Sequence, residues 1–388
     1  MPQKPAITLG RRLSFKYPLK THTYFLLNFR FAFNLCMALY LFGDLAIYCT
    51  AVSKSLRDVS CTKSNSTPSN SSSSGPDNSL MCWEGLTRSD VYKIYVAIFV
   101  TLLGPFAFFN VSKTKYLQMF TTVMRWTAFL SMITLSIMRI TDESQQHGSP
   151  PIIDLSTAPM VFGVSVYAFM CHHSIPSLIT PIENKTKVSS VLAVDYILIA
   201  TFYLLLAFTG IFAFPTVPDL YTLAFKPELG NSGNIAITIV DYFLALFPVL
   251  TLSTNFPIIA ITLRNNLDTI MTDSSPTIAG LSPTARKLLF PTVAILPPAL
   301  VALATEDLGV LVSITGAYAG AGIQYIIPCS LVFLARKKLN QFEKELNLNL
   351  KNPLESFFQH TGFIVMILVW SVLAVGLVTA NFVIEAIK

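Results

Sequence analysis

The chain has 388 residues, of which 53% are hydrophobic and only 12% charged. Soluble domains carry roughly 25% charged residues, so this composition excludes a soluble globular protein and predicts a polytopic membrane protein. The formal charge of +6 does not indicate nucleic-acid binding, because the basic residues lie in short connections between apolar runs, where they set orientation. The six cysteines include no CxxC pair, which argues against a zinc site.

A helix needs about 20 apolar residues to cross the hydrocarbon core. Nine apolar runs approach or exceed that length, and they predict an all-α, multi-pass bundle over residues 24–387. Residues 1–23, which precede the bundle, are polar and are expected in the cytosol. The predicted spans are Tyr24–Val52, Tyr92–Phe109, Leu117–Ile140, Pro159–Pro181, Val191–Phe214, Ile235–Leu263, Leu288–Ala304, Gly309–Ala335 and Thr361–Ile387.

The distribution of Lys and Arg predicts the orientation of these spans. With the N-terminus in the cytosol, most basic residues of the connections fall on the cytosolic side, so we expect a lumenal or extracellular C-terminus. The glycosylation and disulfide signals described next fit the plasma membrane, the Golgi or a lysosome equally well.

The connection at residues 54–90 is rich in Ser and Asn and is expected on the lumenal or extracellular side. Asn65 and Asn70 each begin an Asn-x-Ser/Thr sequon, and Cys61 and Cys82 bracket the low-complexity segment. Glycans and disulfides both belong on that side of a membrane, so we expect glycosylation and a Cys61–Cys82 disulfide. The alternative is that a Ser/Asn-rich run contains sequons by chance.

The run Met160–Pro181 begins as a spanning helix and then reaches Pro176, which lacks a backbone donor and breaks or kinks a helix. Unwound backbone at membrane depth is tolerated only inside the protein or along a wet cavity. A broken apolar helix with polar groups at the break therefore predicts a transporter binding site. The candidate substrate-binding residues are Tyr167, Met170, Cys171, His172, His173, Ser174 and Tyr318.

The pair His172 and His173 does not suffice for a metal site, because the other histidines lie in or near loops. Neither a di-iron nor any other membrane enzyme is supported, since no catalytic constellation is present. Adjacent helical residues point about 100° apart, so the two rings cannot share one face. The two histidines therefore have two alternative roles. They either couple transport to protons, because His titrates near neutral pH, or form structural hydrogen bonds at the break.

Other polar residues at membrane depth need a reason as well. In the first span, Gly43 and Asp44 interrupt an apolar run, and in the third Arg125 either pairs with a carboxylate or snorkels. In the sixth, Ser253 and Thr254 lie between two prolines and are candidate ligands for sodium, which prefers oxygen. Alternatively, these hydroxyls bond back to the helix or to a neighbour.

The eighth span is rich in Gly and Ala, which predicts close helix packing. After it, the basic connection at residues 336–358 begins with apolar residues at helical spacing. It predicts either an amphipathic helix on the membrane or a solvated connector.

Several long collinear motifs resemble the amino acid/auxin permease transporter family. They are GDLAIY at Gly43–Tyr48, GPFAFFNVSKTKYLQ at Gly104–Gln118, MRWTAF at Met124–Phe129, YAFMCHHSIPSLITP at Tyr167–Pro181, FPVLTLSTNFPIIAITLRNN at Phe247–Asn266 and ITGAYAGAGIQYIIP at Ile314–Pro328. The resemblance implies eleven helices, of which ten form two inverted repeats, each opened by a broken helix at the substrate. It also implies coupling of amino acid transport to sodium or protons.

On that plan, Pro159–Pro181 is the broken helix of the second repeat, and Ile235–Leu263 supplies hydroxyls to a sodium site. The chain departs from the family pattern because about nine helices are present and the first pair is not recognisable. We therefore expect an ion-coupled transporter for an amino acid or similar zwitterion, or a truncated form of one. The alternative is a membrane sensor or scaffold that keeps the fold without transporting.

Overall fold

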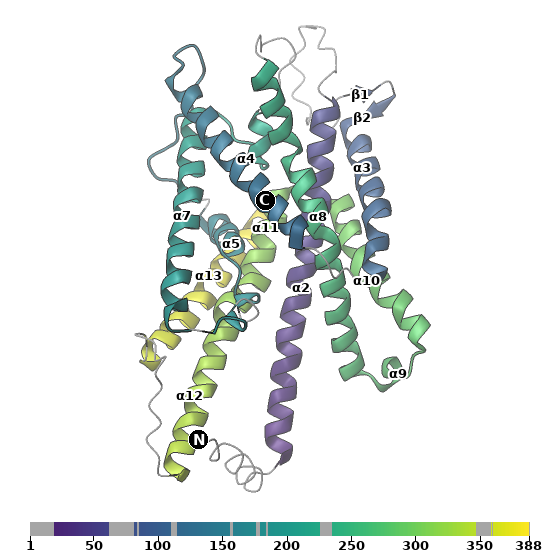
Figure 1. Ribbon diagram of the computed structural model, residues 1–388, viewed down its shortest axis with the longest axis vertical. Coiled ribbons are helices and arrows are strands. Elements are labelled where there is room, and N and C mark those ends of the chain that lie inside the picture. The colour runs from purple at the N-terminus through teal and green to yellow at the C-terminus, as the bar shows by residue number, and fades with distance from the viewer. Residues whose placement is uncertain are drawn as a thin grey trace.

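The computed structural model describes residues 19–61, 81–83, 85–109, 115–155, 158–175, 179–183, 185–225, 235–346, 358 and 360–387. Helices dominate these ranges, so the predicted all-α membrane class is confirmed (Figure 1). The elements are α2 (Leu19–Ser60), β1 (Met81–Trp83), β2 (Leu86–Thr87), α3 (Arg88–Leu103), η3 (Gly104–Phe108), α4 (Lys115–Thr141), α5 (Ala158–Ala168), η4 (Lys185–Lys187), α7 (Val188–Ala213), η5 (Tyr221–Phe225), α8 (Ile235–Ser274), α9 (Pro276–Ala279), α10 (Pro283–Ala304), α11 (Leu308–Thr315), η6 (Gly316–Gly320), η7 (Gly322–Ile326), α12 (Ile327–Leu346) and α13 (Thr361–Ile387).

Within the described residues, eight helices are long and apolar enough to cross a membrane. They coincide with eight of the nine predicted spans. In the ninth, Pro159–Pro181, the helix α5 has 11 residues and the chain then turns, as expected of a broken helix; among the described residues it is too short to cross a membrane by itself. The helix ends at Ala168, and residues 169–174 form turns that do not continue its hydrogen-bond pattern.

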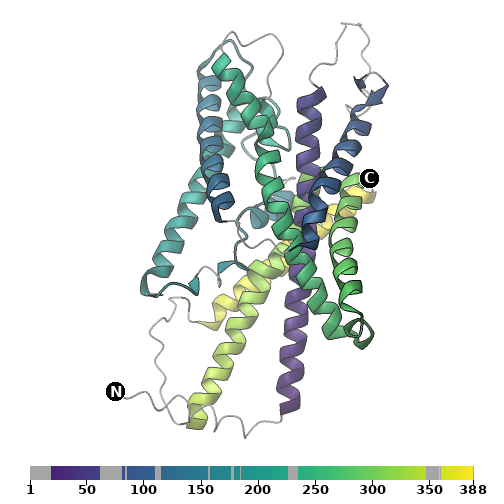
Figure 2. The ribbon, with the colours of Figure 1, turned by 45° about the vertical axis from the view of Figure 1, so that its right-hand side comes forward.

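Helix α2 is the centre of the bundle. Its 42 residues reach roughly 63 Å at 1.5 Å per residue, and it runs most of the height of the molecule in both views (Figures 1 and 2). It packs against α3, α8, α10 and α11, and its buried side chains include Leu45 and Val52. By contrast, α7 exposes large apolar side chains such as Ile197 and Leu204, as expected of a helix that faces lipid.

Two sets of ion pairs mark the two ends of the bundle. At the end that carries the β-hairpin, Arg57 pairs with Asp58 and Glu306, and Arg88 pairs with Asp58 at 2.6 Å (Figure 1). At the other end, near α9, Arg286 pairs with Asp268. Charged side chains thus gather where the helices leave the bilayer, and the apolar spans lie between them.

A short hairpin closes the connection between α2 and α3. Strands β1 and β2 pair antiparallel, and Gly85 adopts φ 82° in the turn between them, a conformation that glycine accepts without strain. Cys61 and Cys82 form a disulfide at the base of this hairpin. Asn65 and Asn70, the predicted glycosylation sites, lie outside the described residues.

The predicted eighth span is divided rather than uniform. Helix α11 passes into two π-helical turns, η6 and η7, before α12 continues. A Cβ atom on Gly316 would lie 1.9 Å from the carbonyl oxygen of Gly163 in α5, so these backbones touch directly. Small residues here permit close packing, as predicted.

Residues 336–346 continue α12 as one helix. The helical alternative is therefore observed for these residues (Figure 2), and its position on the membrane stays a prediction. The remainder of that predicted segment, residues 347–357, lies outside the described residues.

Candidate functional site

The backbone opens at the end of α5. Met170 N–H donates to the carbonyl of Tyr167 at 3.3 Å, and Ser174 N–H donates to that of Cys171 at 2.9 Å, so residues 169–174 form turns instead of a helix. The predicted break at Met170–Ser174 is present and begins before Pro176, which lies outside the described residues. Backbone groups in such turns are available to a ligand.

A buried carboxylate faces this break. Asp44 in the middle of α2 is 3% exposed, and the hydroxyl of Tyr167 donates to its Oδ1 at 2.7 Å. No Lys, Arg or His forms a salt bridge with Asp44 among the residues that the structure describes. An ionisable group at membrane depth without a cationic partner is costly and marks a functional site.

Tyr40 lies one turn before Asp44 on α2 and connects the carboxylate to the histidine pair. Its ring centroid lies 5.4 Å from that of His173 and 6.3 Å from that of Tyr167. The Nδ1 atoms of His172 and His173 are buried and have no hydrogen-bond partner in the described part of the chain. At those two atoms, the simple alternative of structural hydrogen bonding is therefore not observed.

The outer side of the break packs on α7. Cys171 Sγ lies 2.8 Å from the hydroxyl of Tyr196, and the ring of Phe169 stacks near the same tyrosine at 6.4 Å. Cys171 thus faces α7 while Tyr167 faces α2. The turns after α5 span the space between the central helix and a lipid-facing one.

The π-helical segment forms the third wall. A Cβ atom on Gly43 would lie 2.3 Å from Thr315 Oγ1, and Cys36 Sγ donates to the carbonyl of Ala319 at 3.4 Å. Both contacts place α2 directly against η6 and its preceding turn. Because π turns are frequent at functional sites, their position beside Asp44 and the α5 break defines one candidate site.

The family model described as transmembrane amino acid transporter protein matches residues 20–378. The chain belongs to this family. The resemblance found in the sequence motifs is thereby confirmed.

Three animal relatives share one name. The chain is 44% identical over 362 residues to the transmembrane protein 104 homologue of Drosophila melanogaster, covering 91% of this chain and 70% of that protein. It is 45% identical to transmembrane protein 104 of Gallus gallus, covering 92% and 70%. The human protein of that name is 44% identical, with the same coverage of 92% and 70%. No solved structure matches the chain.

In this member of the amino acid transporter family, the predicted ligands do not all meet at one place. Tyr167, Met170, Cys171, His172, His173 and Ser174 lie at the break. Tyr318, by contrast, is 42% exposed, and its hydroxyl lies 2.9 Å from that of Thr379 in α13. Tyr318 therefore packs toward α13 rather than toward Asp44.

The predicted ion ligands lie on α8. Thr254 donates its hydroxyl to the carbonyl of Thr251 at 2.8 Å, and Thr251 donates to that of Phe247 at 2.9 Å. This back-bonding is the alternative noted for the hydroxyls of the sixth span. Arg125 is exposed on α4 and forms no salt bridge with any described residue, so an ion pair is not observed there.

Asp44 and Tyr40 were absent from the predicted ligand set of this family member. The signal was available, since Gly43 and Asp44 interrupt the apolar run LYLFGDLAIY. What the sequence could not indicate is the partner, because Tyr167 lies 123 positions away and meets Asp44 only through the packing of α5 on α2.

Proposed function

We propose that this chain mediates ion-coupled transport of an amino acid or a similar small zwitterion. The supporting observation is the break after α5 beside the buried carboxylate of Asp44. A zwitterion carries one charge of each sign. The open backbone offers N–H and C=O groups to it, and the end of a half-helix carries a partial charge.

In this proposal Asp44 carries the coupling cation. A carboxylate in the bilayer interior is stabilised when a proton or a sodium ion neutralises it. Tyr167 donates to the carboxylate from α5, so loading of the cation changes the hydrogen bond that joins α5 to α2. Ser253 and Thr254 on α8 remain a second candidate cation site, since their helix packs along α2.

The moving part in this mechanism is the segment from α5 to the turns at residues 169–174. Its contacts with η6 are backbone against backbone at Gly163 and Gly316, and small residues allow such surfaces to shift without displacing side chains. Alternating access then exposes the site first to one side of the membrane and then to the other.

Uptake into proteoliposomes tests the proposal. The purified chain is reconstituted and supplied with a panel of labelled amino acids under an inward sodium gradient or an inward proton gradient. Accumulation that requires one gradient and is lost in Asp44→Asn supports coupled transport through this site. Amino acid binding without accumulation under either gradient contradicts it and supports a sensor that keeps the fold.

A further inference from the structure

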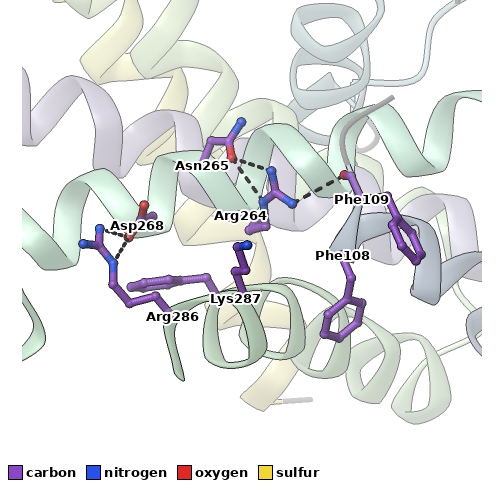
Figure 3. A pocket seen from close by; sticks show the side chains of 8 residues that line it. Phe108, Phe109, Arg264, Asn265, Asp268, Arg286 and Lys287 are labelled. Carbon is purple, nitrogen blue, oxygen red and sulfur yellow. Dashed lines mark hydrogen bonds and ion pairs between the residues drawn. The ribbon is translucent and has the colours of Figure 1, made fainter. Parts of the chain in front are cut away.

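A polar cavity lies away from the helix break, beside the segments that flank α9 (Figure 3). Its volume is about 550 Å³, and its walls come from the end of η3, the C-terminal part of α8 and the first turns of α10. These three segments are far apart in sequence and meet only in the folded bundle. The cavity is therefore formed by tertiary packing and not by one loop.

The charged groups that line the cavity are mostly positive: Arg264, Arg286 and Lys287 face a single carboxylate, Asp268. Arg286 Nε donates to Asp268 Oδ1 at 3.1 Å, which pairs these two charges. Lys287 is exposed and forms no salt bridge with any residue that the structure describes. With Arg286 and Asp268 paired, the charges of Arg264 and Lys287 make the cavity net positive.

Arg264 is held in place by its neighbours. Arg264 Nη1 donates to the carbonyl of Ala107 at 2.8 Å, and its Nη2 donates to Oδ1 of Asn265 at 2.9 Å. In Figure 3 the side chain of Lys287 points from α10 toward the guanidinium of Arg264. A planar guanidinium beside a flexible ammonium suits the oxygens of a phosphate.

The rim of the cavity is apolar and exposed. Phe108 and Phe109 are 48% and 66% exposed at the end of η3, where the chain leaves the apolar span. A ligand that fits here has an anionic head and an apolar body. Basic pockets between transmembrane helices at this level take anionic lipid head groups.

We propose that this cavity binds the phosphate head group of an anionic membrane lipid in the adjacent leaflet. The phosphate contacts Lys287 and Arg264, and the acyl chains pass over Phe108 and Phe109 into the bilayer. This assignment does not depend on transport, because no residue of the cavity belongs to the helix break.

Lipid binding to the purified chain in detergent, measured by native mass spectrometry, tests the proposal. The probes are dioleoyl phosphatidic acid, whose head is a phosphate monoester, and zwitterionic dioleoyl phosphatidylcholine. We expect clear preference for phosphatidic acid, and Lys287→Gln is expected to weaken that binding about fivefold. Lys337→Gln, which removes an exposed charge on α12 outside the cavity, is the matched control and is expected to leave binding unchanged.

Asn265→Asp is a second variant that adds a negative charge while keeping an oxygen for Arg264, and it is also expected to weaken binding about fivefold. Equal affinity for the two lipids, or wild-type affinity in both cavity variants, would overturn the proposal. Competition by glycerol 3-phosphate at the concentrations effective for phosphatidic acid would overturn the lipid assignment and identify a soluble phosphate ester as the ligand. Weak competition by glycerol 3-phosphate supports the lipid.

Discussion

The hydroxyl of Tyr167 in α5 donates a hydrogen bond to Oδ1 of Asp44 in α2 over 2.7 Å. This bond joins the short broken helix to the long central one at the depth where charge is least tolerated. The first two predictions concern its two members.

Asp44→Asn keeps the size of the side chain and removes its charge. We expect cation-driven accumulation to fall about tenfold or more, the size of a typical coupling free energy between two ligands. Exchange of substrate without a gradient should be less affected, since the open backbone is unchanged. Uptake and exchange in proteoliposomes measure both. Asp195→Asn on the lipid-facing helix α7 is the control and should behave as the unmodified chain.

Tyr167→Phe removes the hydrogen bond that joins α5 to the Asp44 side chain, while the contact of Asp44 with Tyr40 on its own helix remains. A lost hydrogen bond to a buried charged group costs about 1.5–3 kcal/mol, so we expect lower thermal stability in detergent and slower uptake. Tyr318→Phe removes a hydroxyl bond to Thr379 at an exposed position and should change stability by about 0.5 kcal/mol or less. Equal melting temperatures for the two variants would contradict the importance of the Asp44 contact.

Gly316→Ala introduces a Cβ atom 1.9 Å from the carbonyl oxygen of Gly163. Because the neighbour is backbone, it cannot rotate away, and overpacking of this kind costs about 1–3 kcal/mol. Gly376→Ala in α13 meets nothing within 4 Å and serves as the control. We expect a lower melting temperature only for Gly316→Ala, and the proposed sliding of α5 on η6 predicts that its uptake is slower too.

Thr254→Ala tests the second candidate cation site. If α8 supplies a sodium ligand, sodium dependence of uptake should be lost while substrate binding remains. Thr262→Ala is matched, since Thr262 also back-bonds within α8, to Ile258 at 2.8 Å, but is exposed. Sodium-dependent uptake that is unchanged in Thr254→Ala would refute the assignment and leave Asp44 as the sole candidate of the two sites.

The side of the membrane occupied by the β-hairpin is testable through Asn65 and Asn70. We expect a glycosidase-sensitive mobility shift that disappears in the double variant Asn65→Gln/Asn70→Gln. Asn110 and Asn184 also begin sequons but fall in predicted cytosolic connections, so Asn110→Gln should leave the shift intact. A shift that depends on Asn110 would reverse the predicted orientation.

The helical architecture was readable from the sequence because apolar runs of about 20 residues have few alternatives in a membrane. Prolines were a weaker guide. Pro248 and Pro257 lie inside the continuous helix α8, whereas α5 ends at Ala168, eight positions before Pro176. Neighbouring helices can satisfy the backbone that a proline frees, so a proline permits a break without fixing its place.

The candidate site was only partly predictable. The residues at the α5 break follow from one local pattern, but the pairing of Tyr167 with Asp44 depends on how α5 packs against α2. The widened turns η6 and η7 were not expected, because a run of Gly and Ala is compatible with an ordinary helix. The close approach of Gly43 to Thr315 also depends on how distant helices pack, so the sequence alone does not predict it.

The Cys61–Cys82 disulfide and the β-hairpin fix both feet of the Ser/Asn-rich segment between α2 and α3. Because both ends of that segment are anchored, a change in its length alters mainly the entropy of loop closure, by about 0.6 kcal/mol for each doubling. Insertion of an epitope or a fluorophore there should leave the central helix undisturbed. On the predicted orientation, an epitope inserted there would be detected from the lumenal or extracellular side and not from the cytosol.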